Sequence, residues 1–411
     1  MTTGDAAGRT IQPPAIVGVE VRTTARAVGS VLRLDDTELT IERVETIALR
    51  VPLKKRYSGS AYSMVNRCTI VTRLYTRGGV VGEVYTGDTD AEQDVIVRII
   101  HEELAPALIG RSAMDPEGCA LAMQPATYDI LRDRGLALQA IACLDAAIWD
   151  TFGKAVGLPL FRLWGASRAA LPIIIIGGYY GLDARDLAAQ MARYVEMGVA
   201  GCKFKIGGAS PAEDAARVRV ARAAVGDDFV LMVDANQGYT RDQAVEFARR
   251  AADLNIRWFE EPCRWYNDRR WMRDVRYATG IPVTAGQSEF TVAGVRDLIV
   301  DGAIDVCNFD SSWSGGPTVW RRVAGLAAAF GVEMGHHEEP QVAAHLLASI
   351  PHGTYVECFD PDRDPIFWGL FANRPAIRDG AYALPDGPGF GIELDGDFIA
   401  RYTVGSRGTE R

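Results

Sequence analysis

Four short hydrophobic runs in the middle of the chain each end in a side chain that could bind a metal ion or move a proton. The runs end at Lys205, Asp234, Glu260 and Gln287, in steps of 29, 26 and 27 residues. Each step is about the length of one strand, one helix and two loops. In a (β/α) barrel the carboxyl ends of the strands meet on one open face, where oxygen ligands from different strands can surround one hard cation. The spacing therefore predicts a metal enzyme with a lysine beside the metal.

Two lysines, Lys203 and Lys205, alternate within one predicted strand. Alternate residues of a strand point to the same side, which in a barrel strand is the interior. Burying an ammonium group costs on the order of several kcal/mol unless it is paired, so two inward lysines are hard to explain as structural residues. Crowding them beside a metal is expected to lower their pKa towards the range useful for a general base.

The individual acidic residues also have ordinary structural explanations. Asp234 alone could cap the following helix, and Glu260 alone could be a solvated loop charge. Their common spacing favours the alternative, in which both side chains are metal ligands.

A second cluster of candidate residues follows further along the chain, with Asp310 and His337 roughly one strand-helix unit apart. Asp310 at the end of the sixth predicted barrel strand and His337 at the end of the seventh form a candidate acid–base pair, because a carboxylate fixes the imidazole tautomer and raises its basicity. Glu357, from the eighth strand, completes the ring, and in its protonated form it could donate a hydrogen bond to a developing oxyanion. Two further histidines, His345 and His352, are equally consistent with a helix or a loop.

The composition limits the possible partners and location. The net charge of −9 argues against a nucleic-acid partner, and no apolar run reaches the roughly 18 residues of a membrane span. The N-terminus lacks a secretion signal, which argues for a cytoplasmic protein. The cysteines are odd in number and never form a Cys-x-x-Cys pair, so they are expected to be reduced thiols. They are Cys68, Cys119, Cys143, Cys202, Cys263, Cys307 and Cys358.

The pattern of strands and helices predicts four segments. Residues 1–39 are an N-terminal extension, and residues 40–165 form an α+β capping domain. This domain is expected to contain a three-stranded antiparallel sheet, at 41–52, 68–76 and 80–85, followed by helices. Residues 166–370 form the catalytic (β/α) barrel, and residues 371–411 return to the capping domain. Eight barrel strands are predicted at 171–176, 202–206, 229–233, 257–259, 282–285, 305–308, 332–335 and 355–357.

These residues and spacings resemble the mandelate racemase and muconate lactonizing enzyme group of the enolase superfamily, from about Ile41 to Leu394. The resemblance implies an α/β fold, with a modified TIM-type barrel and an N-terminal α+β capping domain. It implies Mg²⁺ as the cofactor and a small carboxylic acid as the substrate. Several residues match motifs of the group: Lys203-x-Lys205, the metal ligands Asp234 and Glu260, the pair of Asp310 and His337, and the late glutamate Glu357. Lys205 and His337 would then stand on opposite faces of the substrate.

The third metal ligand departs from the usual pattern of the group. Where relatives usually have Gly-Glu, this chain has Gly286-Gln287, so the ligand would be an amide oxygen. Related glucarate dehydratases use an asparagine at this position, which makes Gln287 acceptable. Glu289, two residues later and on the same face of a continued strand, is the rival ligand.

The leading hypothesis for the activity is Mg-dependent removal of the proton α to a carboxylate, followed by dehydration of an acid sugar, an aldonate or aldarate, to a 2-keto-3-deoxy acid. Polar candidates for binding a polyhydroxylated acid are Asn236, Tyr179, Tyr180 and Asn308. A racemase, epimerase or lactone-forming cycloisomerase is the alternative. The Gln287 replacement also allows a non-catalytic binding protein on the same scaffold.

The capping domain is expected to influence the choice of substrate. A loop at Arg56 to Asn66 is predicted to close over the barrel mouth, although the basic run Lys54-Lys55-Arg56 could equally be a solvated edge. We also expect a homo-oligomer, either a dimer or an octamer.

Overall fold

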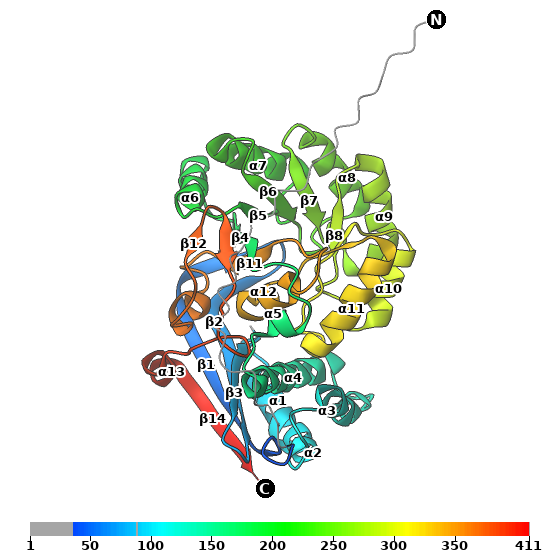
Figure 1. Ribbon diagram of the computed structural model, residues 1–411. Coiled ribbons are helices and arrows are strands. Elements are labelled where there is room, and N and C mark those ends of the chain that lie inside the picture. The colour runs from blue at the N-terminus through cyan, green and yellow to red at the C-terminus, as the bar shows by residue number, and fades with distance from the viewer. Residues whose placement is uncertain (1–35, 88, 411) are drawn as a thin grey trace, which may run out of the picture. The chain divides into compact units, whose positions relative to one another are not determined.

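The computed structural model describes residues 36–87 and 89–410. Most of the expected N-terminal extension, residues 1–39, lies outside these described residues. Within them, Figure 1 shows an antiparallel sheet with its own helices, coloured mainly blue to cyan, and a strand-helix barrel, coloured green to orange. A single continuous cluster of buried apolar side chains includes residues from both regions. This shared core fixes the capping region against the barrel.

The sheet of the capping region has four antiparallel strands in the order β14-β1-β2-β3. The sequence predicted the first three, so the expected three-stranded sheet was incomplete. The missing strand, β14, comes from the C-terminus and is almost entirely exposed and polar. It therefore lacks the alternation of buried and exposed residues that identifies a strand. The strands are β1 (Ile41–Ser58), β2 (Ser63–Thr76), β3 (Val81–Thr86) and β14 (Thr403–Glu410).

Helices cover this sheet, and the longest of them, α4, lies in the core. Asp133 caps its start by accepting a hydrogen bond from the Gly135 backbone N–H at 2.8 Å, and Gly157 ends it in the left-handed conformation. By length and composition α4 could cross a membrane, but 78% of its apolar window is buried inside the protein, so it is a core helix. The helices are α1 (Gln93–Ile99), a π-helix (Ile100–Leu104), α2 (Ala105–Leu108), α3 (Pro116–Met123), a 3-10 turn (Gln124–Thr127), α4 (Arg134–Val156) and α5 (Leu160–Leu163).

The barrel is built from β4 to β11, and the expected fold class is confirmed. Neighbouring strands from β4 to β10 pair in parallel, β11 pairs in parallel with β4, and a bridge between Met334 and Gly353 closes the ring. The strands are β4 (Ala170–Gly177), β5 (Gly201–Lys205), β6 (Val230–Asp234), β7 (Ile256–Glu260), β8 (Val283–Ala285), β9 (Val306–Cys307), β10 (Glu333–Met334) and β11 (Val356–Phe359).

Helices surround the barrel strands on the outside (Figure 1). Several begin with side-chain caps that the sequence provides, such as Ser210 before α7 and Thr240 before α8, each paired with a Glu or Gln three residues later. The helices are α6 (Ala184–Glu196), α7 (Pro211–Val225), α8 (Arg241–Arg250), a 3-10 turn (Trp265–Asn267), α9 (Asp268–Thr279), α10 (Val292–Val300), α11 (Pro317–Phe330) and α12 (Pro340–Ala348).

The chain after β11 runs back towards the capping region. A π-helix (Ile366–Leu370) is followed by a hairpin of β12 (Ile377–Arg378) and β13 (Ala381–Ala383), which pairs antiparallel with β4. The helix α13 (Gly396–Tyr402) then leads into β14. The boundaries 40–165, 166–370 and 371–411 remain a proposal for the limits of the domains.

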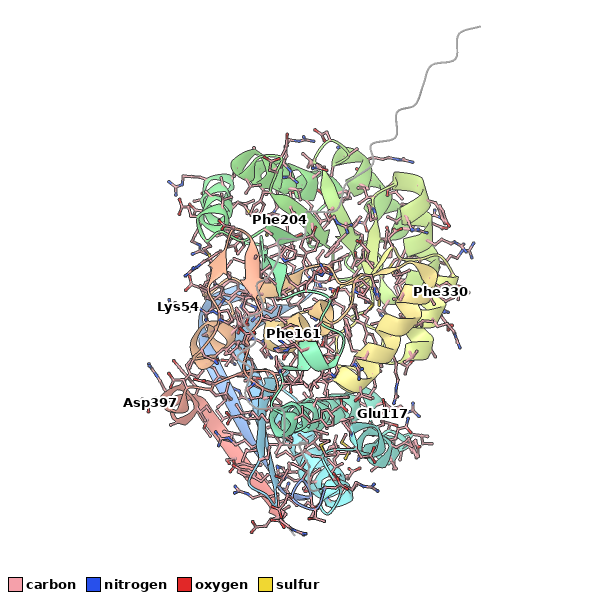
Figure 2. All side chains as sticks on the ribbon, viewed as in Figure 1. Lys54, Glu117, Phe161, Phe204, Phe330 and Asp397 are labelled. Atoms are coloured by element: carbon pink, nitrogen blue, oxygen red, sulfur yellow. The ribbon has the colours of Figure 1, made fainter. Side chains whose placement is uncertain are left out.

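Strand β5 shows how the fold directs side chains to the barrel interior. Phe204, labelled in Figure 2, points outward from the barrel. The guanidinium of Arg217 on α7 lies 5.0 Å from its ring centroid. Because side chains alternate along a strand, Lys203 and Lys205 face the opposite side, and both are buried. The local pattern Lys-Phe-Lys therefore places two amines inside the barrel.

Candidate active site

Neighbouring strands place three of the expected site residues side by side at one end of the barrel. Lys205 is in register with Asp234, and Asp234 is in register with Glu260, at the carboxyl ends of β5, β6 and β7. Gln287 follows β8 after Gly286, whose φ of 139° is a conformation that favours glycine. The spacing read from the sequence thus corresponds to a row of adjacent strand ends.

Both lysines are paired with carboxylates in the interior. The Nζ atom of Lys203 lies 2.7 Å from an oxygen of Glu260 and 2.8 Å from an oxygen of Glu357. The Nζ atom of Lys205 lies 2.6 Å from Asp234 Oδ2. Glu357 accepts a hydrogen bond from Lys203 in this structure, and the expectation that a protonated Glu357 could donate to a developing oxyanion stays a prediction.

Pairing with carboxylates alone raises the pKa values of both lysines, and the lower pKa values expected beside a metal stay a prediction. Burial disfavours the charge on Lys205, but attraction to Asp234 outweighs it and raises the pKa well above its usual range. Burial also opposes the charge on Lys203, where Glu260 and Glu357 raise the pKa. Both amines are accordingly ammonium groups in this arrangement. A divalent cation that shared these carboxylates would weaken the attraction and move both pKa values down.

The three expected metal ligands fit a hard divalent cation. Two oxygens, Glu260 Oε2 and Gln287 Oε1, are buried and have no hydrogen-bond partner among residues 36–87 and 89–410. Leaving a buried acceptor unsatisfied costs about 1–3 kcal/mol, and a bound cation would remove that cost. Carboxylate and amide oxygens are ligands that Mg²⁺ takes in proteins. With Asp234 they make a donor set of two carboxylates and one amide.

This donor set includes an amide, Gln287, so it differs from a metal site made only of acidic, histidine or cysteine side chains. In the part of the chain that the structure describes, no three such side chains form a group that could hold a metal ion. The rival ligand Glu289 lies against Gly294 in the first turn of α10, and its pKa is raised mainly by burial. Gln287, by contrast, lines the main cavity of the site. The geometry therefore supports Gln287 as the third ligand.

The expected histidine–aspartate pair is formed. The Nδ1 atom of His337 lies 2.8 Å from Asp310 Oδ2, and the other oxygen of Asp310 accepts hydrogen bonds from the N–H and hydroxyl of Ser312. The ring of Trp313 lies against the imidazole, with centroids 5.1 Å apart. Burial lowers the pKa of His337, but Glu338 and Asp310 raise it to about 9.

The other nearby histidines serve the fold. His336 accepts a hydrogen bond from the Ser311 backbone N–H, and burial lowers its pKa. His345 lies on α12 and accepts a hydrogen bond from the Phe161 backbone N–H. Of these three histidines, only His337 lines the cavity.

A cavity of about 280 Å³ joins these groups at the barrel mouth. The segment Arg56 to Asn66, expected to be a loop, is instead the paired ends of β1 and β2 with a short turn at 59–62. Its Tyr62 and Met64 contribute to the cavity wall, whereas Lys54 is exposed and paired with Asp362 at 3.0 Å. The barrel and the capping region both provide lining residues. Six of them are Lys205, Gln287 and His337 from the barrel and Tyr62, Met64 and Thr89 from the capping region.

The polar residues expected to bind substrate divide into two groups. Asn236 and Tyr179 line the cavity, and Asn236 Oδ1 accepts a hydrogen bond from Lys205 at 3.0 Å. Tyr180 instead donates to Asp214 outside the cavity, and Asn308 donates to Glu260 within the ion-pair network. The last two are therefore supporting residues.

Several further residues of the cavity were not identified from the sequence, among them Trp313, Glu338 and Arg363. Glu338 directly follows His337, so its position was a usable signal. Arg363 and Trp313 lie in loops after β11 and β9, where the sequence has no periodic pattern to indicate direction. The guanidinium of Arg363 lies over the ring of Phe359, 4.4 Å from its centroid.

Comparison with known proteins agrees with this architecture. Residues 42–165 match the family "Mandelate racemase / muconate lactonizing enzyme, N-terminal domain", and residues 186–398 match "Enolase C-terminal domain-like". The 3,6-anhydro-alpha-L-galactonate cycloisomerase of Streptomyces coelicolor is 31% identical over 372 residues, which cover 89% of this chain and 100% of that protein. The L-talarate/galactarate dehydratase of Salmonella typhimurium is 31% identical over 296 residues, covering 71% and 72%.

A solved structure is closer in sequence. A mandelate racemase/muconate lactonizing enzyme from a marine actinobacterium, crystallised in complex with magnesium, is 55% identical and superposes with a TM-score of 0.85, over 89% of this chain and 100% of that one. That protein therefore carries the cofactor that the sequence predicted. Together these matches show that the chain belongs to the mandelate racemase and muconate lactonizing enzyme group of the enolase superfamily.

Proposed function

We propose that the protein removes the proton α to the carboxylate of an acid sugar, an aldonate or an aldarate, and releases water to give a 2-keto-3-deoxy acid. The observation that carries the proposal is that Lys205, His337 and Gln287 line one cavity. An amine and an imidazole are thus available to the same bound molecule, beside the donor set for a cation.

Asp234, Glu260 and Gln287 would hold Mg²⁺, which supplies stabilisation of the negative charge that develops on a carboxylate when its α proton leaves. The chain's own groups move the protons. Of Lys205 and His337, one takes the α proton and the other returns a proton. Return to the β-hydroxyl releases water, whereas return to the α carbon inverts or restores its configuration.

Other residues would orient the acid and limit water access. Asp310 and Trp313 fix the imidazole of His337, while Tyr62 and Met64 cover the cavity from the capping region. Asn236 and Tyr179 add polar atoms to the wall. These features suit a hydroxylated acid better than a purely apolar one.

Incubation of the Mg²⁺-loaded protein with a panel of stereoisomeric aldonates and aldarates tests the proposal, with a colorimetric assay for 2-keto acids. We expect at least one member of the panel to give a keto acid. Absence of keto acid across the panel, together with racemisation of an aryl hydroxy acid, would overturn it.

Isomerisation of a hydroxy acid or a lactone is the second candidate. It is favoured by the 31% identity to a cycloisomerase over the whole length of that protein. Incorporation of solvent deuterium at the α carbon without keto-acid formation would support this candidate over dehydration.

A further inference from the structure

Glu338 occupies an unusual position beside the acid–base histidine. Its Oε1 atom lies 3.3 Å from Nε2 of His337, the ring nitrogen that Asp310 does not contact. Asp310 Oδ2 lies 2.8 Å from Nδ1 of the same ring. The imidazole is therefore placed between two carboxylates, one at each nitrogen.

This arrangement selects one protonation state of the ring. A neutral imidazole has one N–H and one lone pair, so with its N–H directed at Asp310 the lone pair would face an oxygen of Glu338. A protonated imidazole has two N–H groups, one for each carboxylate. The geometry alone thus favours the imidazolium form of His337.

The backbone around Glu338 holds this contact in place. Glu338 and Glu339 have φ values of 55° and 50°, a left-handed conformation that side chains with a Cβ rarely adopt. The Glu338 backbone N–H donates to Glu357 Oε2 at 3.2 Å, and its carboxylate lies 4.0 Å from the Arg67 guanidinium. Strained conformations persist where the surroundings over-determine them, and they are concentrated at functional sites.

We propose that Glu338 is a positioning residue that keeps His337 protonated, so that His337 is the proton donor of the reaction and Lys205 the acceptor. The proposal rests on the proposed function. In that reaction Lys205 takes the α proton, and the C–H electrons form a C=C bond to the carboxylate carbon, whose C=O electrons move onto oxygen. As those electrons return, a C=C bond forms between the α and β carbons while the β C–O bond breaks, and His337 gives its Nε2 proton to the departing hydroxyl, which leaves as water. The enol that results gains a proton at the β carbon as its own hydroxyl loses one, which gives the 2-keto-3-deoxy acid.

The charged groups around the His337 ring come from several elements, and some raise its pKa while another lowers it. Asp310, after β9, and Glu338, after β10, favour the charged ring, whereas Lys203 on β5 opposes it. Burial lowers the pKa of His337, yet Glu338 through its charge, and Asp310 through its hydrogen bond and its charge, raise it to about 9. An opposite charge within about 4–6 Å commonly changes a pKa by 1–3 pH units.

The direct test is NMR titration of His337 in Mg²⁺-loaded protein labelled with ¹³C and ¹⁵N in its five histidines. Its signal is assigned by its loss in His337→Asn. In Glu338→Gln we expect the His337 pKa to fall by about 1 pH unit or more. Glu338→Asp, which retains the charge, should recover part of the difference.

Glu339→Gln is the matched control. It removes the neighbouring carboxylate, which accepts from the Gly87 backbone N–H instead of contacting the imidazole, so the His337 pKa should stay near the wild-type value. An unchanged His337 pKa in Glu338→Gln, or an equal decrease in Glu339→Gln, would overturn the role of Glu338. Circular dichroism of each variant checks that it is folded.

The rate of reaction gives a second readout. If His337 donates a proton, kcat/KM falls at alkaline pH as the ring loses its proton, and in Glu338→Gln this alkaline limb moves to lower pH by the same interval as the NMR titration. An acidic limb that moves instead would mean that His337 is the base, and would overturn the assignment. The NMR titration needs no substrate, so it tests the role of Glu338 even if the protein does not catalyse dehydration. A wrong proposed function would be detected only by the product assay.

Discussion

Lys205 and His337 are each held by a carboxylate before any substrate binds. Lys205 contacts Asp234 at 2.6 Å, and His337 contacts Asp310 at 2.8 Å. Fixed partners of this kind orient an acid or base and reduce the rearrangement required during reaction. At the residue scale, the site is therefore a pair of pre-oriented proton carriers.

Replacement of Lys205 by Met tests the role of the amine. The change keeps a side chain of similar length but removes the group that exchanges a proton, so kcat should fall by about 10²- to 10⁴-fold. The loss is measured with the keto-acid assay. Lys54→Met removes an exposed lysine paired with Asp362 and should leave kcat within about twofold. Comparable activity in wild type and Lys205→Met would exclude Lys205 from the chemistry.

Replacement of Gln287 by Glu tests the metal ligand. A third carboxylate adds negative charge to the donor set, so the Kd for Mg²⁺ should decrease by about tenfold, as measured by isothermal titration calorimetry. Glu289→Gln is the control and should leave the Kd unchanged, because Glu289 does not line the cavity. Weaker Mg²⁺ binding in Glu289→Gln alone would identify Glu289 as the ligand.

At the element scale, the sequence predicted the barrel and its strand ends well. Each barrel strand is a short apolar run, and parallel strands in register convert similar sequence steps into neighbouring positions, as with Lys205, Asp234 and Glu260. The spacing therefore predicts that these three side chains lie close together, and this prediction does not require the conformation of any loop.

Elements without a periodic pattern could not be predicted in the same way. The strand β14 is polar and exposed, and it is fixed only by pairing with β1, a contact distant in sequence. The conformation of Glu338 depends on Glu357 and on the turn before α12, neither of which a local pattern specifies. The pKa values of the lysines likewise depend on partners that only the folded structure brings near.

The helix α4 provides a test of packing between elements. A Cβ added at Gly153 would lie 2.6 Å from Gly389 Cα, which belongs to the backbone of the returning segment. Gly153→Ala should therefore lower the free energy of unfolding by about 1–3 kcal/mol, measured by urea denaturation. Gly325→Ala, in the exposed interior of α11 with open space around it, should instead raise it by about 0.5–1 kcal/mol. A Gly153→Ala variant as stable as wild type would contradict this close approach.

At the scale of the whole molecule, His345 connects three distant segments. On α12, its Nδ1 accepts from the Phe161 backbone N–H at 3.2 Å, and its Nε2 donates to the Phe390 carbonyl at 3.0 Å. Both nitrogens are thus satisfied in the neutral ring. Burial lowers the pKa of His345 to about 3.

The stability of the protein should consequently depend on acid pH. Above about pH 6.5 the ring is neutral in both the folded and the unfolded chain, and the stabilisation is complete. Below about pH 6.5, His345 binds a proton in the unfolded chain but not in the folded one. Relative to neutral pH, His345 should therefore lower the free energy of unfolding by about 2 kcal/mol at pH 5. His345→Gln should show a shallower decrease in urea denaturation between pH 7 and pH 5. An unaltered slope would contradict the role of the neutral ring.

The capping region and the barrel together enclose the reacting groups, and the central claim concerns what happens there: metal-dependent removal of an α proton by a pair formed from Lys205 and His337. The most direct measurement follows the α-proton signal of acid sugars by ¹H NMR in D₂O with the Mg²⁺-loaded protein. The account predicts loss of that signal with formation of a 2-keto-3-deoxy acid, dependent on Mg²⁺ and absent in both Lys205→Met and His337→Asn. Retention of the α proton in every acid tested, by a protein that binds Mg²⁺, would contradict it.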